Sequence, residues 1–288
     1  MLAEARDFIL RNARLLERRR FAAEFEDGPA AAAIAALGAY CNEDGGFGAA
    51  LEPDKRDPAS QPVDVQFALE TMDAVGAFDR AMALRTCDFL VGVSTSEGGV
   101  PFALPSVNDF PHAPWWDCEA DPPANLNPTA AILGVLLKHR IEHAWIAPAI
   151  AFCWDAIAKI NRTEFHELMP VLAFLEQVPD RMRADRAMRE VLDRIAAPGG
   201  VELDPDAVGY VHMPLEWAPT PSAPCRKLFT DTVIATHLKM LAAKQQGDGG
   251  WPISWDPIGP GVELEWRGIR TLDALRTLRA YGADRSSP

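Results

Sequence analysis

The sequence predicts an all-α protein built from repeated pairs of helices, and three observations support this fold class. Apolar residues recur at helical spacing along most of the 288 residues, and no run of useful length alternates apolar with polar side chains. Adjacent glycines begin at positions 45, 98, 199 and 249, so a pair recurs about every 50 residues with one copy missing. Each pair follows a helical segment and opens the connection to the next one. We therefore expect stacked helical hairpins whose longer connections gather along one rim.

The glycine pairs are followed by apolar or aromatic residues. The clearest copy is Gln245–Pro252, where Trp251 follows the pair, and Asn42–Gly48 is the next clearest. Weaker copies occur at Glu97–Phe102 and Pro198–Val201. Glycine supplies the positive φ that ends a helix, and the aromatic residue can wedge between neighbouring helices. These segments are therefore interpreted as markers of the fold rather than as catalytic motifs.

Ten helices follow from the periodicity and from the residues that break it. Gly28-Pro29 interrupts the chain after the first helix, and Pro62 suits the first turn of a helix, where its missing N–H costs nothing. Only one clear helix lies between the pairs at 199 and 249, so either a short helix hides in the proline-rich stretch or the repeat is irregular there. The expected helices are Leu2–Arg19, Ala30–Tyr40, one beginning at Pro62, Arg80–Val91, Thr129–His139, His143–Ile160, Glu164–Gln177, one from Pro179 to about Ala196, Arg226–Gln245 and Glu263–Tyr281.

The domain organisation expected from this pattern is a single domain spanning residues 1–288. It comprises an N-terminal helix (1–20), the repeats (30–281) and a polar tail (282–288). Long connections are expected at 42–61, 94–125, 197–226 and 246–263, whereas Asn161-Arg162-Thr163 forms a short turn where the missing glycine copy should fall. Long connections in a compact domain usually carry function.

Composition excludes several classes of function. The formal charge of −13 and the pI of about 4.9 disfavour a nucleic-acid partner, because an acidic chain repels a phosphate backbone. No apolar run reaches the length of a membrane span, and the charged first helix is not a signal peptide. The five cysteines are odd in number and widely spaced, so we expect free thiols in the reducing cytoplasm.

The repeated segments resemble those of the α/α-toroid superfamily, which contains terpenoid cyclases and the β subunits of protein prenyltransferases. The best match is Lys244–Trp251, followed by Asn42–Phe47, and the resemblance covers about residues 30–281. It implies an α/α toroid of about five helical hairpins, with inner and outer helix layers around an apolar, aromatic-lined cavity. The two-domain cyclases carry a second wall that this chain would need to obtain by forming a homodimer or by binding a partner.

The first functional hypothesis is an isoprenoid-processing enzyme similar to the cyclases that start their reaction by protonation. That chemistry needs a carboxylic acid kept protonated in an apolar cavity and aromatic faces that stabilise carbocations, and the resemblance implies no cofactor. The family's acid motif is DxDD, which this chain lacks. The candidate catalytic acids are Asp204 and Asp206, with Asp117 and Glu119 as alternatives near Asp121, and at least one should face an apolar cavity. The candidate substrate-binding residues are Phe102, Trp115, Trp116, Tyr210, His212 and Trp217.

Two alternatives stay open. In a zinc-dependent prenyltransferase the metal ligands would come from His112/Asp117/Cys118 or Cys225/Asp231/His237, and neither set has the family's Asp-x-Cys spacing. A diphosphate would need a basic cradle, for which Lys55-Arg56 and Arg267/Arg270 are the candidates near connections. Without either site, the chain would be a binder of an apolar small molecule or an interaction scaffold on the same fold.

Overall fold

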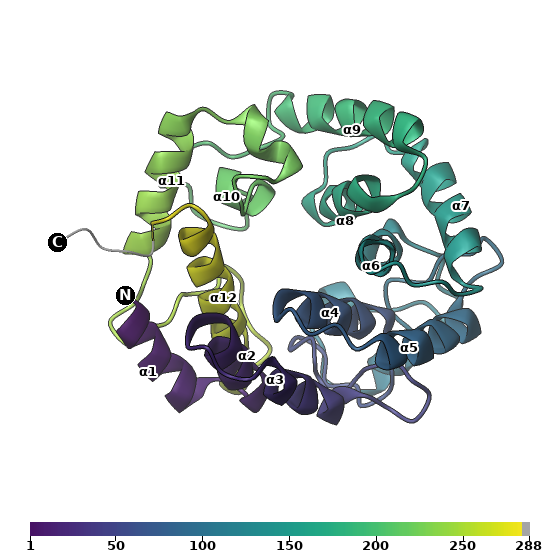
Figure 1. The fold of residues 1–288 in the computed structure, drawn as a ribbon, viewed down its shortest axis with the longest axis horizontal. Helices are drawn as coiled ribbons and strands as arrows, with labels where there is room; N and C mark the ends of the chain where they lie inside the picture. Colours follow the sequence, from purple (N-terminus) through teal and green to yellow (C-terminus); the bar gives the residue numbers. More distant parts are fainter. Residues whose placement is uncertain (284–288) are drawn as a thin grey trace. The chain divides into compact units, whose positions relative to one another are not determined.

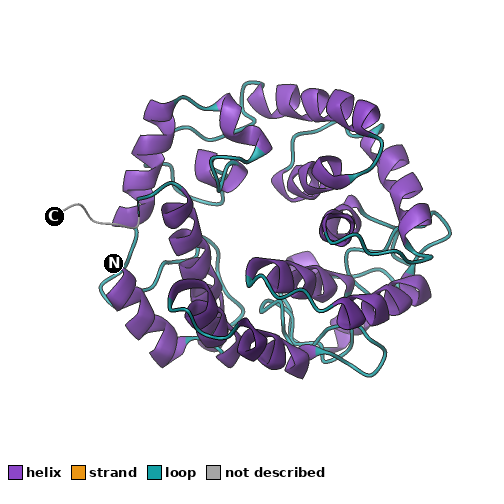
Figure 2. Cartoon of the chain, in the orientation of Figure 1, coloured by secondary structure: helices purple, strands orange, loops and turns teal. Residues whose placement is uncertain are grey.

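The computed structural model describes residues 1–283, and these residues form twelve α-helices and four short 3-10 helices without any β-strand (Figure 2). The all-α fold class predicted from the sequence is therefore confirmed. Residues 284–288 of the expected polar tail lie outside the described residues. Within residues 1–283, no helix combines the length with the apolar character that crossing a membrane requires.

The helices group into two compact units. One unit comprises Met1–Glu26 together with the chain from Leu192 onward, and the other comprises Asp27–Val191. Each unit is described separately below.

In the unit 27–191, helices pack in two layers. Helix α6 (Leu126–Lys138) packs against α4 (Pro62–Ala74) and α8 (Phe165–Gln177) on either side. Figure 1 shows these three helices in one layer and α5 and α7 in a second layer beside them. The remaining elements of the unit are α3 (Ala30–Leu37), η1 (Gly38–Tyr40), α5 (Arg80–Val93), η2 (Pro105–Asp109), η3 (Pro114–Trp116), α7 (Ile146–Ile157) and most of α9 (Arg181–Ala196).

In the other unit, α12 (Pro260–Ala280) is the central helix and contacts α1 (Leu2–Asn12), α2 (Leu15–Phe25) and α11 (Asp231–Ala243). Its core gathers side chains from distant parts of the sequence, because α1 supplies Phe8 and Ile9 while α12 supplies Leu272 and Leu275. Trp251 lies in the same core and donates its indole N–H to the carbonyl of Leu241 at 2.7 Å, as expected for a structural wedge. This unit also contains η4 (Pro224–Leu228) and α10 (Pro214–Trp217).

The structure corrects two of the expected helices and supplies a missing one. The chain expected to form one helix over Leu2–Arg19 forms α1 and α2, because Ala13 and Arg14 adopt extended backbone conformations. Arg18 donates from Nε to the carbonyl of Ala13 at 2.8 Å, which satisfies a group that the break exposes. The helix expected from Arg226 begins only at Asp231, since η4 intervenes. Of the two alternatives left open for the proline-rich stretch, a short helix is present there, namely α10.

Three glycine pairs share one packing arrangement. The first glycine lies so close to a backbone carbonyl of another helix that an added methyl group would overlap it, and the second lies against a phenylalanine four residues further along the same helix. The pair at 199 differs, because no atom lies within 4 Å of the place where a methyl group on Gly199 would be. The matching sets are Gly45–Gly46 with Arg85 and Phe89 of α5, Gly98–Gly99 with Pro148 and Phe152 of α7, and Gly249–Gly250 with Glu4 and Phe8 of α1.

Candidate functional site

The four acids predicted to be catalytic are all exposed. The carboxylate of Asp117 accepts a contact from His112 Nε2 at 2.9 Å while its side chain remains 78% exposed. Asp204 accepts the backbone N–H of Asp206 at 3.0 Å, which is a local turn contact. Glu119 forms part of the same exposed surface segment as Asp117. None of these carboxyl groups, nor that of Asp121, has the buried environment that keeps an acid protonated at neutral pH.

The predicted aromatic residues fall into two clusters, one in each unit. In the unit 27–191, Phe102 stacks on Trp116 with ring centroids 4.5 Å apart, whereas Trp115 is 48% exposed. In the other unit, the ring of Tyr210 packs edge-on against His212 and Trp255. Trp217 is buried in that unit as well. The stack of the half-buried Phe102 on the buried Trp116 thus brings together two of the aromatic residues that the sequence predicted.

The two proposed zinc sets do not converge. Next to the His112–Asp117 contact, the thiol of Cys118 points to the carbonyl of Ala103, 3.2 Å from Sγ. In the second set, Asp231 pairs with Arg226, and His237 contacts the carbonyl of Leu203 instead of Cys225. Across residues 1–283, no three His, Cys, Asp or Glu side chains lie together in a way that could hold a metal ion.

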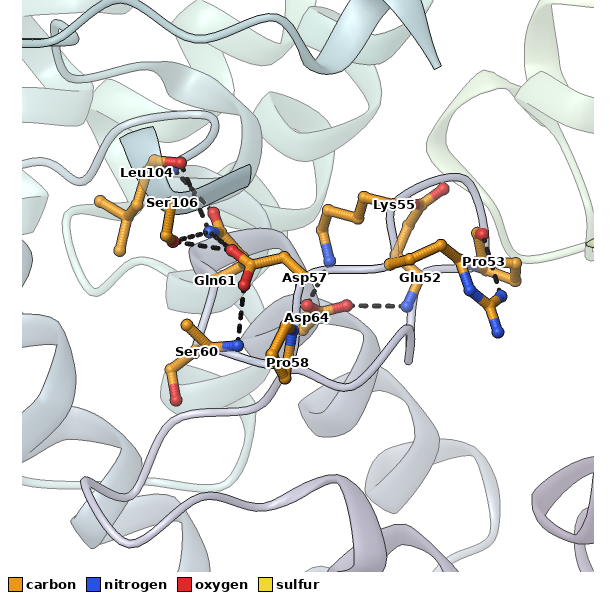
Figure 3. Close-up of polar contacts among 12 residues, drawn as sticks. Glu52, Pro53, Lys55, Asp57, Pro58, Ser60, Gln61, Asp64, Leu104 and Ser106 are labelled. Atoms are coloured by element: carbon orange, nitrogen blue, oxygen red, sulfur yellow. Dashed lines mark hydrogen bonds and ion pairs between the residues drawn. The ribbon is translucent and has the colours of Figure 1, made fainter. Parts of the chain in front are cut away.

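Five of the buried charged side chains lie close together in the sequence, in the connection between α3 and α4 and in the first turn of α4. Glu52, Asp54, Lys55, Asp57 and Asp64 are each at most 3% exposed. Charged residues are rarely buried unless they are paired, so five of them within thirteen positions need a specific arrangement. We refer to Glu52, Asp54, Lys55 and Asp64 as the acid cluster, and Figure 3 shows three of them, with Asp57 nearby.

The acid cluster is centred on Asp64, which lies in the first turn of α4. Its carboxylate pairs with the ammonium of Lys55 through one oxygen and accepts the backbone N–H of Glu52, at 2.7 Å, through the other (Figure 3). Just before Glu52, Ala49 and Ala50 both adopt the left-handed conformation, with φ of 54° and 63°. This turn of the backbone directs Glu52 towards the N-terminus of α4. Such strain in two consecutive non-glycine residues is typical of functional sites.

A hydrogen-bond network joins this connection to the one between α5 and α6. Asp57 accepts the side chains of Gln61 and Ser106 at 2.6 and 2.7 Å and the backbone N–H of Ala59 at 2.9 Å. Gln61 in turn accepts the backbone N–H of Leu104 at 2.7 Å (Figure 3). All three hydrogen bonds of the Asp57 carboxylate therefore come from donors. Together with the Gln61–Leu104 bond, they fix the two connections against each other.

The second connection covers the acid cluster. Its backbone pairs with the first connection, since Ala113 donates to the carbonyl of Asp54 at 2.8 Å and Arg56 donates to that of Pro111 at 2.9 Å. Trp116 follows directly, and the Lys55 ammonium lies 5.8 Å from the centroid of its ring. Trp116 is only 4% exposed, and its indole N–H has no hydrogen-bond partner among the described residues. Through Lys55 and Trp116, the aromatic stack and the acid cluster therefore lie next to each other and form one candidate site.

Glu52 has the most perturbed carboxyl group in this site. Burial raises its pKa from 4.5 to about 8, and the nearby carboxylates of Asp54 and Asp64 add to the increase. The charge of Lys55 and a hydrogen bond from the Asp54 backbone act in the opposite direction without reversing it. The Oε2 atom of Glu52 has no hydrogen-bond partner within the described residues. A pKa of about 8 favours the protonated form of Glu52 at neutral pH, next to the Lys55–Asp64 ion pair.

Sequence reasoning missed Glu52, although a signal was present. Glu52-Pro53-Asp54 has the same acid–proline–acid pattern as Asp204-Pro205-Asp206, and it lies in the connection that the glycine pair at 45 opens. The structure buries the first pattern and exposes the second. Acids in proline-rich connections are usually solvated, so the pattern alone does not distinguish the two cases.

Comparison with known proteins adds no family to this description: no protein-family model matches the chain, and no curated protein matches its sequence.

Proposed function

We propose that this chain is an isoprenoid-processing enzyme on an α/α toroid, and that Glu52 donates the proton that starts its reaction. The observation that carries the proposal is the burial of the Glu52 carboxyl group beside two other carboxyl groups, which raises its pKa to about 8 and favours its protonated form at neutral pH. A general acid works best when its pKa lies near the working pH.

The packing of the glycine pairs supports the toroid. The pairs at 45 and 98 each lie against a helix of the second layer of their own unit, namely α5 and α7. The pair at 249 follows α11 and lies against α1, the first helix of the chain. A contact between the last glycine pair and the first helix is what the proposed toroid of inner and outer helices requires.

The reaction proposed is protonation of a carbon–carbon double bond. The π electrons take the proton from the Glu52 carboxyl group and form a C–H bond, which leaves a carbocation on the neighbouring carbon and a carboxylate on Glu52. The stacked rings of Phe102 and Trp116 offer π faces to a cation, and the carboxylates of Asp54 and Asp64 provide negative charge nearby. Tyr210, His212 and Trp217 belong to the other unit, and their role in substrate binding stays a prediction.

The charge of the acid cluster favours a substrate without a diphosphate group. Lys55 is its only cation, and Asp64 neutralises it through a direct ion pair. Among the other cations proposed for a diphosphate cradle, Arg267 pairs with Asp248 at 2.7 Å and Arg270 with Glu216 at 3.7 Å. A diphosphate beside Asp54 and Asp64 would meet like charge, so we expect an apolar polyprene.

The proposal is tested by incubating the protein with polyprenes of several lengths and, in parallel, with the corresponding prenyl diphosphates. We expect cyclised products from the polyprenes, and in D₂O each product should gain one deuterium delivered by Glu52. Glu52→Gln should abolish turnover, since an amide cannot supply the proton, whereas Glu43→Gln in the exposed part of the same connection should leave it unchanged. Polyprene binding without turnover would instead identify a non-catalytic binder, and turnover that survives in Glu52→Gln would refute the role of Glu52.

A further inference from the structure

A second site lies in the unit 27–191, in a cleft of about 430 Å³ beside α7. Apolar side chains form part of its wall, because Leu126 and Phe152 line it and are almost completely buried. The other walls are polar and charged. The lining residues that carry charge or an amide are Glu97, Asn125, Asp155, Lys159, Asn161, Arg162 and Glu167.

The cleft lies where the repeat loses one of its long connections. The connection between α5 and α6 packs against the preceding long connection through the backbone hydrogen bonds described above. The next equivalent connection, between α7 and α8, is reduced to residues 158–164 and has no glycine pair. Residues 124–126, which a third long connection would be expected to cover, line the cleft instead. The cleft is thus a consequence of the missing repeat copy.

The α7 helix and the turn that follows it present the cleft with a carboxylate and an ammonium group. Phe152, Asp155 and Ala156 line it from α7, and Lys159 lines it from the turn, two residues beyond the end of the helix at Ile157. Within residues 1–283, the side chains of Asp155, Lys159 and Glu97 form no ion pair or hydrogen bond, whereas Arg162 lies 3.6 Å from Glu167. The cleft therefore holds opposite charges that do not neutralise each other.

We propose that this cleft binds a small zwitterion, an α-amino acid with an apolar side chain. Its ammonium group would pair with Asp155 and Glu97, its carboxylate with Lys159, and its side chain would pack on Phe152 and Leu126. A volume of about 430 Å³ lies within the size range of small-molecule sites, roughly 300–1,000 Å³. A ligand with only one charge would leave either Asp155 or Lys159 without a partner. This site does not depend on Glu52 or on the proposed reaction.

Binding is measured by calorimetry with L-phenylalanine and L-leucine, and with phenethylamine and hydrocinnamate as analogues that carry one charge each. We expect the amino acids to bind at least about tenfold more tightly than either analogue, because each analogue loses one charge-assisted contact. In NMR spectra, the side-chain amide signals of Asn125 and Asn161 should shift on titration with L-phenylalanine.

Variants locate the two charges. Asp155→Asn should weaken L-phenylalanine binding about tenfold and leave hydrocinnamate binding unchanged or stronger. Lys159→Gln should also weaken L-phenylalanine binding about tenfold, but it should leave phenethylamine binding unchanged or stronger. Asp185→Asn, which alters an exposed acid of α9 outside the cleft, is the matched control. Absence of amino-acid binding at millimolar concentration, equal binding of the singly charged analogues, or equal effects of Asp155→Asn and Asp185→Asn would each overturn the proposal.

Discussion

Glu52 and Asp57 are buried to similar depth only five residues apart, but their surroundings differ. The Asp57 carboxylate accepts three hydrogen bonds, from Gln61, Ser106 and the backbone of Ala59. Glu52 leaves one carboxyl oxygen without a donor and has two carboxylates nearby. A buried carboxylate needs donors to stay charged, so the first environment suits an anion and the second a neutral acid. The supply of donors, in addition to burial, therefore separates a structural acid from a candidate proton donor.

The neutral Glu52 predicts how stability depends on pH. Because its folded pKa of about 8 lies above the value near 4.3 of an unfolded glutamate, the folded chain binds the proton more tightly. This contribution to stability is complete below pH 4 and is lost as the pH rises to about 8, at about 1.4 kcal/mol per pH unit within that window. This contribution is absent from Glu52→Gln. The free energy of unfolding of the variant, relative to that of the wild type, should therefore increase as the pH rises.

Urea denaturation at pH 5, 7 and 8.5 measures this difference. The free energy of unfolding of Glu52→Gln relative to wild type should increase by several kcal/mol between pH 5 and pH 8.5. Glu43→Gln, an exposed acid of the same connection, should follow the wild type at every pH. Parallel pH profiles for Glu52→Gln and wild type would show that Glu52 titrates normally in the folded protein.

At the scale of the elements, the glycine pairs allow a matched comparison. Gly98 and Gly199 have similar left-handed backbones, with φ of 92° and 83°. A methyl group on Gly98 would lie 2.7 Å from the carbonyl oxygen of Pro148, whereas one on Gly199 would have no atom within 4 Å. Gly199→Ala should therefore cost only the backbone strain, about 1–2 kcal/mol. Gly98→Ala should cost about 1–3 kcal/mol more, since α7 must move away.

Chemical denaturation of the two variants under identical conditions provides the test. The difference between them isolates the contact between the glycine pair and the helix, because both share the same strain. If Gly98→Ala were no less stable than Gly199→Ala, the close contact between Gly98 and α7 would contribute nothing to stability. The glycine pairs would then be ordinary turns.

Local sequence features predicted the helices better than the site. Pro62 marks the start of α4 as expected, because a proline at the first helical position acts through its own backbone. The break at Ala13 was missed, because the apolar periodicity continues through it. The site depends on which segment covers another: residues 104–116 bury Glu52-Pro53-Asp54, and nothing similar covers Asp204-Pro205-Asp206. Such tertiary coverage is not encoded in a local pattern.

At the scale of the whole molecule, the proposed toroid predicts that both units unfold together. Helix α9 runs across the boundary between the units, and a closed ring would add further packing on both sides. Gly98→Ala alters a contact inside the unit 27–191, and Gly249→Ala alters the contact with Glu4 in the other unit. If the ring is closed, each substitution should lower the stability of both units by a similar amount. Amide hydrogen exchange in increasing urea, followed for peptides of both units, should then show one shared transition that shifts in either variant. The contrary result is two separate transitions, with Gly98→Ala shifting only that of the unit 27–191 and Gly249→Ala only that of the other unit. It would show that the units fold independently and would contradict the toroid.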